Sequence, residues 1–224
     1  MSGRAVETKG ERTRERIRAA ALRSFRENGY DATTIRRLAD ELGLSVGATH
    51  YHFASKNELI QELYLDVQQA HRDVAEPLLA AEDGLVQRLG IVFRTGLDHL
   101  EPYHAHAGEF LSAAVSPRSP INPLAHDSAA ALSVIEGLFA EAVEGAEPSG
   151  LPDDIRALLP RALVLLHLLL AVFWVYDTSD GRTRTRRLLE RGLRLLRTTL
   201  PMARLPLLRR PLRELLALVN EVGA

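Results

Sequence analysis

The chain of 224 residues contains no cysteine. Disulfides, thiolate nucleophiles and cysteine metal ligands are therefore excluded, and the composition suits a reducing compartment. Residues 1–20 also lack the apolar run that precedes a cleavage site in a secretory leader. We expect a cytoplasmic protein.

Long apolar runs are scarce. The longest charge-free stretch is ALVLLHLLLAVFWVY, 15 residues bracketed by Arg161 and Asp177. A membrane-spanning helix needs about 20 apolar residues. The stretch instead predicts a buried helix, and an all-round apolar helix needs cover on every side, which a second subunit can supply.

Catalytic motifs are absent as well. The sequence has no G-x-S-x-G elbow, phosphate loop, G-x-G-x-x-G or H-E-x-x-H. The best cluster is YHAHAGEF, where His106 and Glu109 share a helix face. A metal site there and ordinary pocket or surface histidines are both open, but nothing repeats at ligand spacing, so we expect no enzyme, metal or cofactor.

No sustained alternation of apolar and polar residues indicates strands, so the fold class expected is all-α. Prolines in SPRSPINP mark a loop between helices. The apolar spacing and the capping residues predict helices over residues 11–27, 34–42, 45–52, 56–76, 85–100, 105–115, 127–144, 151–176, 182–200 and 212–219.

Two short helices joined by a tight turn are expected over residues 34–56. Thr34 is a candidate N-cap of the first, and Gly43 falls where its end needs a left-handed residue. Ser45 caps the second, whose small Gly47 and Ala48 allow its N-terminus to approach a surface closely. This is the helix-turn-helix arrangement, whose second helix enters a DNA major groove.

These residues and their neighbours resemble the N-terminal DNA-binding domain of TetR-family transcriptional regulators. The resemblance covers residues 16–63 and rests on many motif positions in order, among them Gly29, Tyr30, Gly43, Phe53 and Lys56. It implies a DNA-binding head over residues 1–55 and a helical effector-binding and dimerisation domain over residues 56–224. The DNA-contacting positions expected are Thr34, Ser45, Val46, Gly47, Ala48, His50, Tyr51, His52 and Lys56.

Charge is segregated along the chain. Residues 1–60 hold 11 basic and 8 acidic side chains, residues 61–181 hold 6 and 18, and residues 182–224 hold 11 and 3. Only the first segment combines positive charge with the DNA-binding motif, and Arg4 and Lys9 of its N-terminal arm are further candidates for phosphate contact. The basic C-terminal segment is either a second phosphate-binding surface or, as we prefer, the solvated face of amphipathic helices.

A homodimer is expected through residues 151–176 and 182–200, reading a palindromic operator. Gly192 lies within the apolar stripe of the second segment, which suggests close helix crossing.

The function expected is a dimeric repressor released from double-stranded DNA by a small-molecule effector. The alternative is a DNA-binding regulator whose helical domain only dimerises or binds a protein partner. Polar-tipped aromatic residues and histidines among apolar helices favour an effector pocket, with Gly96 and Gly108 breaking the helix faces. Its expected lining is Phe93, Leu97, Leu100, Tyr103, His106, Phe110, Leu111, Phe139, His167 and Trp174.

Overall fold

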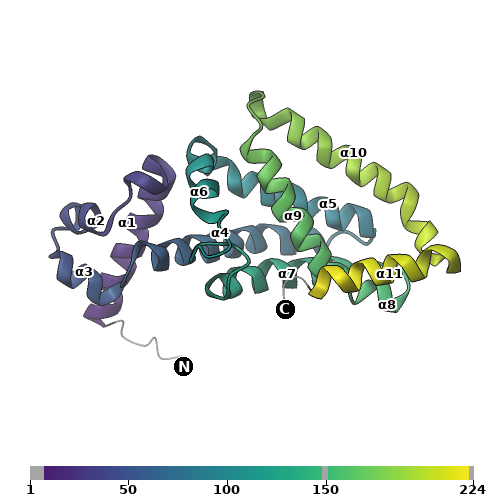
Figure 1. Cartoon of the computed structure of the whole chain (residues 1–224), viewed down its shortest axis with the longest axis horizontal. Coiled ribbons are helices and arrows are strands. Elements are labelled where there is room, and N and C mark those ends of the chain that lie inside the picture. The colour runs from purple at the N-terminus through teal and green to yellow at the C-terminus, as the bar shows by residue number, and fades with distance from the viewer. Residues whose placement is uncertain (1–7, 148–150, 222–224) are drawn as a thin grey trace. The chain divides into compact units, whose positions relative to one another are not determined.

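A computed structural model describes residues 8–147 and 151–221. Within these ranges every regular element is helical, which confirms the all-α prediction (Figure 1). Arg4 of the predicted arm lies outside the described residues. The chain divides into two compact units: residues 1–64 with 102–127, and residues 65–101 with 128–224.

The first unit contains the predicted helix-turn-helix. The long helix α1 (Lys9–Ala32) has its N-cap at Thr8. The backbone of α1 leaves helical geometry at Gly29, where φ is 81°. The break falls just after residue 27, where the first predicted helix ends, because glycine tolerates a positive φ without steric cost. Besides α1, this unit contains the α-helices α2 (Ile35–Leu42), α3 (Val46–His52) and α6 (Ala107–Ala114). It also contains the first turns of α4 (Lys56–Leu79).

Apolar side chains of α1, α2 and α4, together with Phe53 at the end of α3, form the core of the first unit. Ile17, Phe25, Leu38 and Phe53 have no exposed surface. The ring of Phe110 on α6 packs edge-on against Phe25, at 5.9 Å between centroids. The segment 102–127 thus belongs to the compact unit of the head, whereas the functional boundary expected at residue 55 stays a prediction.

The second unit is a bundle in which α7 packs against α5 and α9. Its core includes Leu89, Phe93, Leu138 and Phe139, all almost fully buried. Its α-helices are the rest of α4, α5 (Leu85–Leu100), α7 (Ala129–Glu144), α8 (Asp153–Arg156), α9 (Leu159–Val175), α10 (Thr183–Thr199) and α11 (Pro206–Glu221).

Prolines change three of the predicted boundaries. The last helix was expected over residues 212–219, but α11 (Pro206–Glu221) begins at Pro206 and contains Pro211. The helix expected over residues 151–176 is split into α8 and α9, because Pro160 has no N–H for the carbonyl of Arg156 and its ring crowds that group. Helix α4 was expected to end before Pro77 but continues to Leu79. Pro77 and Asp73 are both exposed, so water can serve the carbonyl that loses its partner.

Candidate nucleic-acid interface

The turn between α2 and α3 is built as the sequence indicates. Gly43 adopts a left-handed conformation with φ 65°, and its N–H bonds back to α2. The hydroxyl of Ser45 then accepts the N–H of Ala48 at 3.0 Å and so caps α3. Thr34 caps α2 in the same way by accepting the N–H of Arg37 at 3.2 Å. Three predicted positions, Thr34, Gly43 and Ser45, therefore fix the backbone of the two helices.

Helix α3 packs against the rest of the first unit through one side only. No other described part of that unit covers its opposite side. Thr49 is its one buried residue, and its hydroxyl bonds the carbonyl of Ser45 at 3.2 Å. Tyr51 is 86% exposed, although the large apolar ring of a tyrosine is usually packed against other side chains. A Cβ added to Gly47 would meet nothing within 4 Å. The N-terminal end of α3 can therefore approach a flat or grooved surface closely.

His50 has a defined hydrogen-bonding polarity. Its Nδ1 lies 3.2 Å from the carbonyl oxygen of Ala54. A carbonyl only accepts, so Nδ1 carries the proton, and in the neutral ring Nε2 is left as an acceptor. The exposed His50 ring therefore offers an acceptor to a partner's N–H group.

Lys56 is bound to its own unit. Its ammonium nitrogen donates to the carbonyl oxygen of Tyr30 at 3.0 Å and lies 3.7 Å from the centroid of the Tyr30 ring. Desolvation by burial lowers the pKa of Lys56. The negative charges of Asp31 and Glu109 act in the opposite direction but have a smaller effect. The ammonium group keeps further N–H donors, so a phosphate contact at Lys56 stays a prediction.

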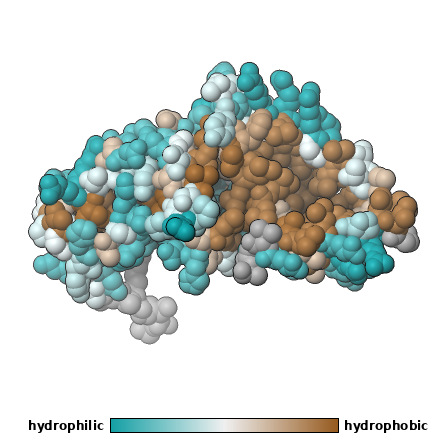
Figure 2. Space-filling model, in the orientation of Figure 1, coloured by the Kyte–Doolittle hydropathy of each residue, from teal (hydrophilic) through white to brown (hydrophobic). Residues whose placement is uncertain are grey.

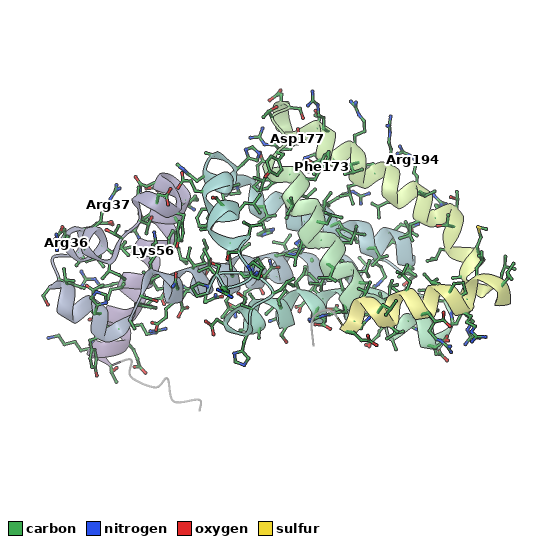
Figure 3. All side chains as sticks on the ribbon, viewed as in Figure 1. Arg36, Arg37, Lys56, Phe173, Asp177 and Arg194 are labelled. Atoms are coloured by element: carbon green, nitrogen blue, oxygen red, sulfur yellow. The ribbon has the colours of Figure 1, made fainter. Side chains whose placement is uncertain are left out.

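An arginine on α2 was not among the predicted contact residues. Arg36 is exposed and has no hydrogen bond or ion pair within the described chain, whereas its neighbour Arg37 is bonded to Asn28 and Ala32 (Figure 3). The apolar spacing of α2 places both arginines on its solvent-facing side. Which of the two is hydrogen-bonded within the unit depends on contacts outside the helix. Arg36 is the guanidinium on this helix that stays available to an anion.

The N-terminal part of the chain, residues 17–63, matches the family model of bacterial regulatory proteins of the tetR family. Residues 88–221 match that of the tetracyclin repressor-like C-terminal domain, which by itself covers more than half of the chain. The chain belongs to the TetR family.

Among curated relatives of this TetR-family chain are two transcriptional repressors. KstR2 of Mycobacterium tuberculosis is 36% identical over 91 residues, which are 39% of this chain and 42% of the relative. AcnR of Corynebacterium diphtheriae is 38% identical over 89 residues, with the same shares of 39% and 42%. The chain thus spans less than half the length of these relatives.

The fold is shared with solved TetR-family structures. Thermus thermophilus FadR, a transcriptional repressor solved in complex with lauroyl-CoA, matches with a TM-score of 0.62 at 24% identity. The match covers 82% of this chain and 92% of the FadR chain. The TetR regulator of Nitrosomonas europaea has a TM-score of 0.60 at 18% identity, with shares of 82% and 96%. At these identities the likeness concerns the fold.

The ten residues expected to line an effector pocket fall in both units of this TetR-family chain. In the second unit Phe93, Phe139 and His167 pack together, with ring centroids 5.0 to 6.1 Å apart. Leu97 and Trp174 are buried there, and Leu100 is half-buried. The space that Gly96 leaves is filled by the ring of His167, which would lie 2.6 Å from a Cβ there.

Tyr103, His106, Phe110 and Leu111 belong to the first unit. The ring of Phe110 contacts Tyr30 as well as Phe25, at 5.9 Å between centroids. Gly108 is exposed with open space at its Cβ position. A pocket role for these four residues stays a prediction.

The cluster at residues 103–110 has a structural role that the sequence did not reveal. Nδ1 of His106 lies 2.9 Å from a carboxylate oxygen of Glu109, as their shared face predicts, and the other oxygen accepts the N–H of Asp31 at 3.1 Å. The N–H of Asp31, followed by the bond from His106, lowers the pKa of Glu109. Glu109 thereby ties α6 to the end of α1. No group of metal-ligating side chains is found among the described residues.

None of the described helices combines the length and the apolar character that crossing a membrane would demand.

Proposed function

We propose that this chain is a dimeric transcriptional repressor that binds a palindromic operator through α3 and leaves it when a small molecule binds the second unit. The observation that carries the proposal is the uncovered side of α3. A helix of seven residues that buries Thr49 alone and presents Tyr51 outward is exposed for a partner. Its capped N-terminus and open Gly47 suit a phosphate backbone and a major groove.

Roles for the individual side chains follow from their bonding. The acceptor at Nε2 of His50 suits the amino groups of adenine or cytosine in the major groove. Tyr51 and Arg36 are free to contact phosphates, and Val46, Ala48 and His52 complete the surface beside them. Thr34 and Ser45 act by holding the helices, since each hydroxyl already accepts a backbone N–H.

The dimer is supported by apolar surface that the second unit leaves open. Figure 2 shows hydrophobic side chains gathered over α9 and along α11. Leu169 on α9 and Leu195 on α10 are each 64% exposed, and Phe173 is 44% exposed (Figure 3). Burying one such side chain gains roughly 1.5 to 3 kcal/mol. A second copy of the chain would cover α9 and α10, the segments that the sequence predicted for dimerisation.

Gly192 fits the same interface. The close crossing expected at this glycine does not occur among the described residues, because Gly192 is exposed and a Cβ there would meet none of their atoms within 4 Å. It lies one turn from both Leu188 and Leu195, which are exposed on the same helix. A glycine at that place lets a partner helix come close.

Release from DNA requires an effector with unequal affinity for two conformations. A ligand that binds both equally shifts nothing, and moving a population from 1:99 to 99:1 takes about 5.5 kcal/mol of differential binding. The packed rings of Phe93, Phe139 and His167, with Trp174 buried in the same unit, support an apolar effector with a small number of hydrogen-bonding groups. Two subunits related by a two-fold axis would read half-sites about 34 to 36 Å apart, or a multiple of this.

The test titrates candidate compounds against fluorescence anisotropy of a labelled operator and against the emission of Trp174, the one tryptophan. Compounds that change both signals together, with both effects lost in Phe139→Ala, support the proposal. Compounds that alter Trp174 emission while the protein stays on DNA favour the alternative, in which the helical domain dimerises or binds a protein partner. An absence of DNA binding at low salt overturns the proposal.

A further inference from the structure

Three histidines from three helices form a row inside the second unit. The ring of His71 on α4 lies 5.8 Å from that of His99 on α5 and 6.1 Å from that of His167 on α9. His71 and His167 are buried, and His99 is half-buried. Gly96 makes room for the row, because a Cβ there would lie 2.6 Å from His167 and 3.1 Å from His71.

Two members of the row have protein partners. Nε2 of His71 lies 3.0 Å from the carbonyl oxygen of Val92 and 2.9 Å from the hydroxyl of Thr95. Nδ1 of His99 lies 2.8 Å from the carbonyl oxygen of Thr95. Since carbonyl oxygens only accept, both nitrogens carry protons. These bonds fix the rings of His71 and His99.

His167 differs from both. Its Nδ1 is buried and has no hydrogen-bond partner among the described residues, and 5% of the residue is exposed. Burial lowers the pKa of His167 to about 4, so its ring is neutral near pH 7. A buried polar atom without a partner is costly, so a group from outside the chain that bonded Nδ1 of His167 would remove this cost.

The neighbours of His167 restrict what that group can be. Its ring is flanked by Phe93, Phe139 and the imidazole of His71, all without charge at neutral pH. A carboxylate or an ammonium group placed among them would be a buried charge without a counter-charge, which is strongly unfavourable. A hydroxyl group avoids this cost, and because it both donates and accepts it pairs with either tautomer of a neutral imidazole.

We propose that His167 is the polar anchor for a neutral, mainly apolar ligand that carries a hydroxyl group, with Phe93 and Phe139 packing against its apolar body. The assignment rests on the proposed function, because it names the class of effector that the second unit takes. An anionic or cationic effector is disfavoured by the same arrangement.

The test uses the full chain and three probes of similar size: phenol, toluene and benzoate. Histidine ring 15N shifts and saturation titrations give the site and the dissociation constants. One buried hydrogen bond predicts that phenol binds about tenfold tighter than toluene. Phenol should move the ring resonances of His167, and benzoate should bind more weakly than phenol.

Three variants locate the preference. His167→Phe keeps a flat ring of similar size, so toluene affinity should persist while the preference for phenol disappears. His167→Gln restores a neutral hydrogen-bonding group and should recover part of the preference. His99→Phe is the matched control from the same row and should retain the wild-type ratio.

Equal affinities for phenol and toluene in the wild type, as expected if a water molecule already completes His167, would overturn the assignment. So would a phenol preference that survives in His167→Phe, or the absence of phenol binding at millimolar concentration. Failure of the proposed function is measured separately by operator anisotropy. In that case phenol binds with the expected preference and no ligand releases the DNA.

Discussion

The ammonium nitrogen of Lys56 lies 3.0 Å from the carbonyl oxygen of Tyr30, so the start of α4 is bonded to the end of α1. Lys56→Met removes this bond and the contact with the Tyr30 ring at 3.7 Å. We expect a loss of about 1 to 2 kcal/mol in the free energy of unfolding, measured by urea denaturation. Lys9→Met, at an exposed position, is the control and should change little.

The same variant tests the phosphate contact. If Lys56 also touches DNA, Lys56→Met weakens binding to all sequences alike and lowers the slope of log K against log salt by about one unit. A salt slope equal to that of the wild type would remove Lys56 from the interface and leave it with the bond to Tyr30.

Tyr51 and Thr49 separate DNA binding from stability within one helix. Tyr51→Ala removes a side chain that is 86% exposed, so we expect at least about a tenfold loss of operator affinity with little change in melting temperature. Thr49→Ala removes a buried hydroxyl that bonds Ser45, so the melting temperature should fall. Unchanged operator affinity in Tyr51→Ala would refute the contact.

Gly192 tests the interface on α10. In the isolated chain Gly192→Leu meets open space and should favour the helix, since glycine costs about 1 kcal/mol of helix propensity. In a dimer with close helix contact the same side chain should raise the dissociation constant, measured by sedimentation. Gly137→Leu on α7, at an exposed glycine with equally open space, is the control. Equal dissociation constants for the two variants would move the interface away from Gly192.

Acid should destabilise the second unit through its buried histidines. Burial, with the charge of His167 next in importance, lowers the pKa of His71 to about 3, and burial lowers that of His167 to about 4, from an ordinary value of 6.5. The unfolded chain therefore binds more protons between these values, so stability is full above about pH 6.5 and declines as the pH falls toward 4. Denaturation at several pH values should show this slope, and it should be shallower in His167→Phe. The same slope in that variant would contradict the role of His167.

Arg88 joins three chain segments of the second unit. Its buried guanidinium donates to the carbonyl oxygens of Leu79, Glu82, Glu141 and Ala142. Arg88→Lys cannot reach all of them, and each lost hydrogen bond from a charged group costs about 1.5 to 3 kcal/mol. We expect a total loss above about 3 kcal/mol. Arg94→Lys on the same helix alters an exposed pair with Glu190 and should cost less than about 1 kcal/mol.

Features determined by neighbouring residues were predictable from the sequence. The caps at Thr34 and Ser45 and the left-handed Gly43 each depend on a few adjacent positions, and all occur as expected. Helix α5 has the predicted bounds for the same reason.

Features that depend on distant contacts were not predictable. Glu109 caps the N–H of Asp31, 78 positions away, and no periodicity signals that pairing. The bond from Lys56 to Tyr30 spans 26 positions and gives the lysine a role beyond its charge. The sequence predicted His167 only as one of several pocket residues. The hydrogen bonds of His71 and His99 show that, of the three rings, His167 has a buried Nδ1 without a partner among the described residues.

The most direct test of the central claim selects binding sites for the purified chain from a pool of random DNA duplexes. The account predicts enrichment of inverted repeats, bound by two chains per duplex, with Tyr51→Ala enriching none. Enrichment of sites without two-fold symmetry, binding by one chain, or no enrichment at all would contradict a dimeric repressor that reads DNA through α3.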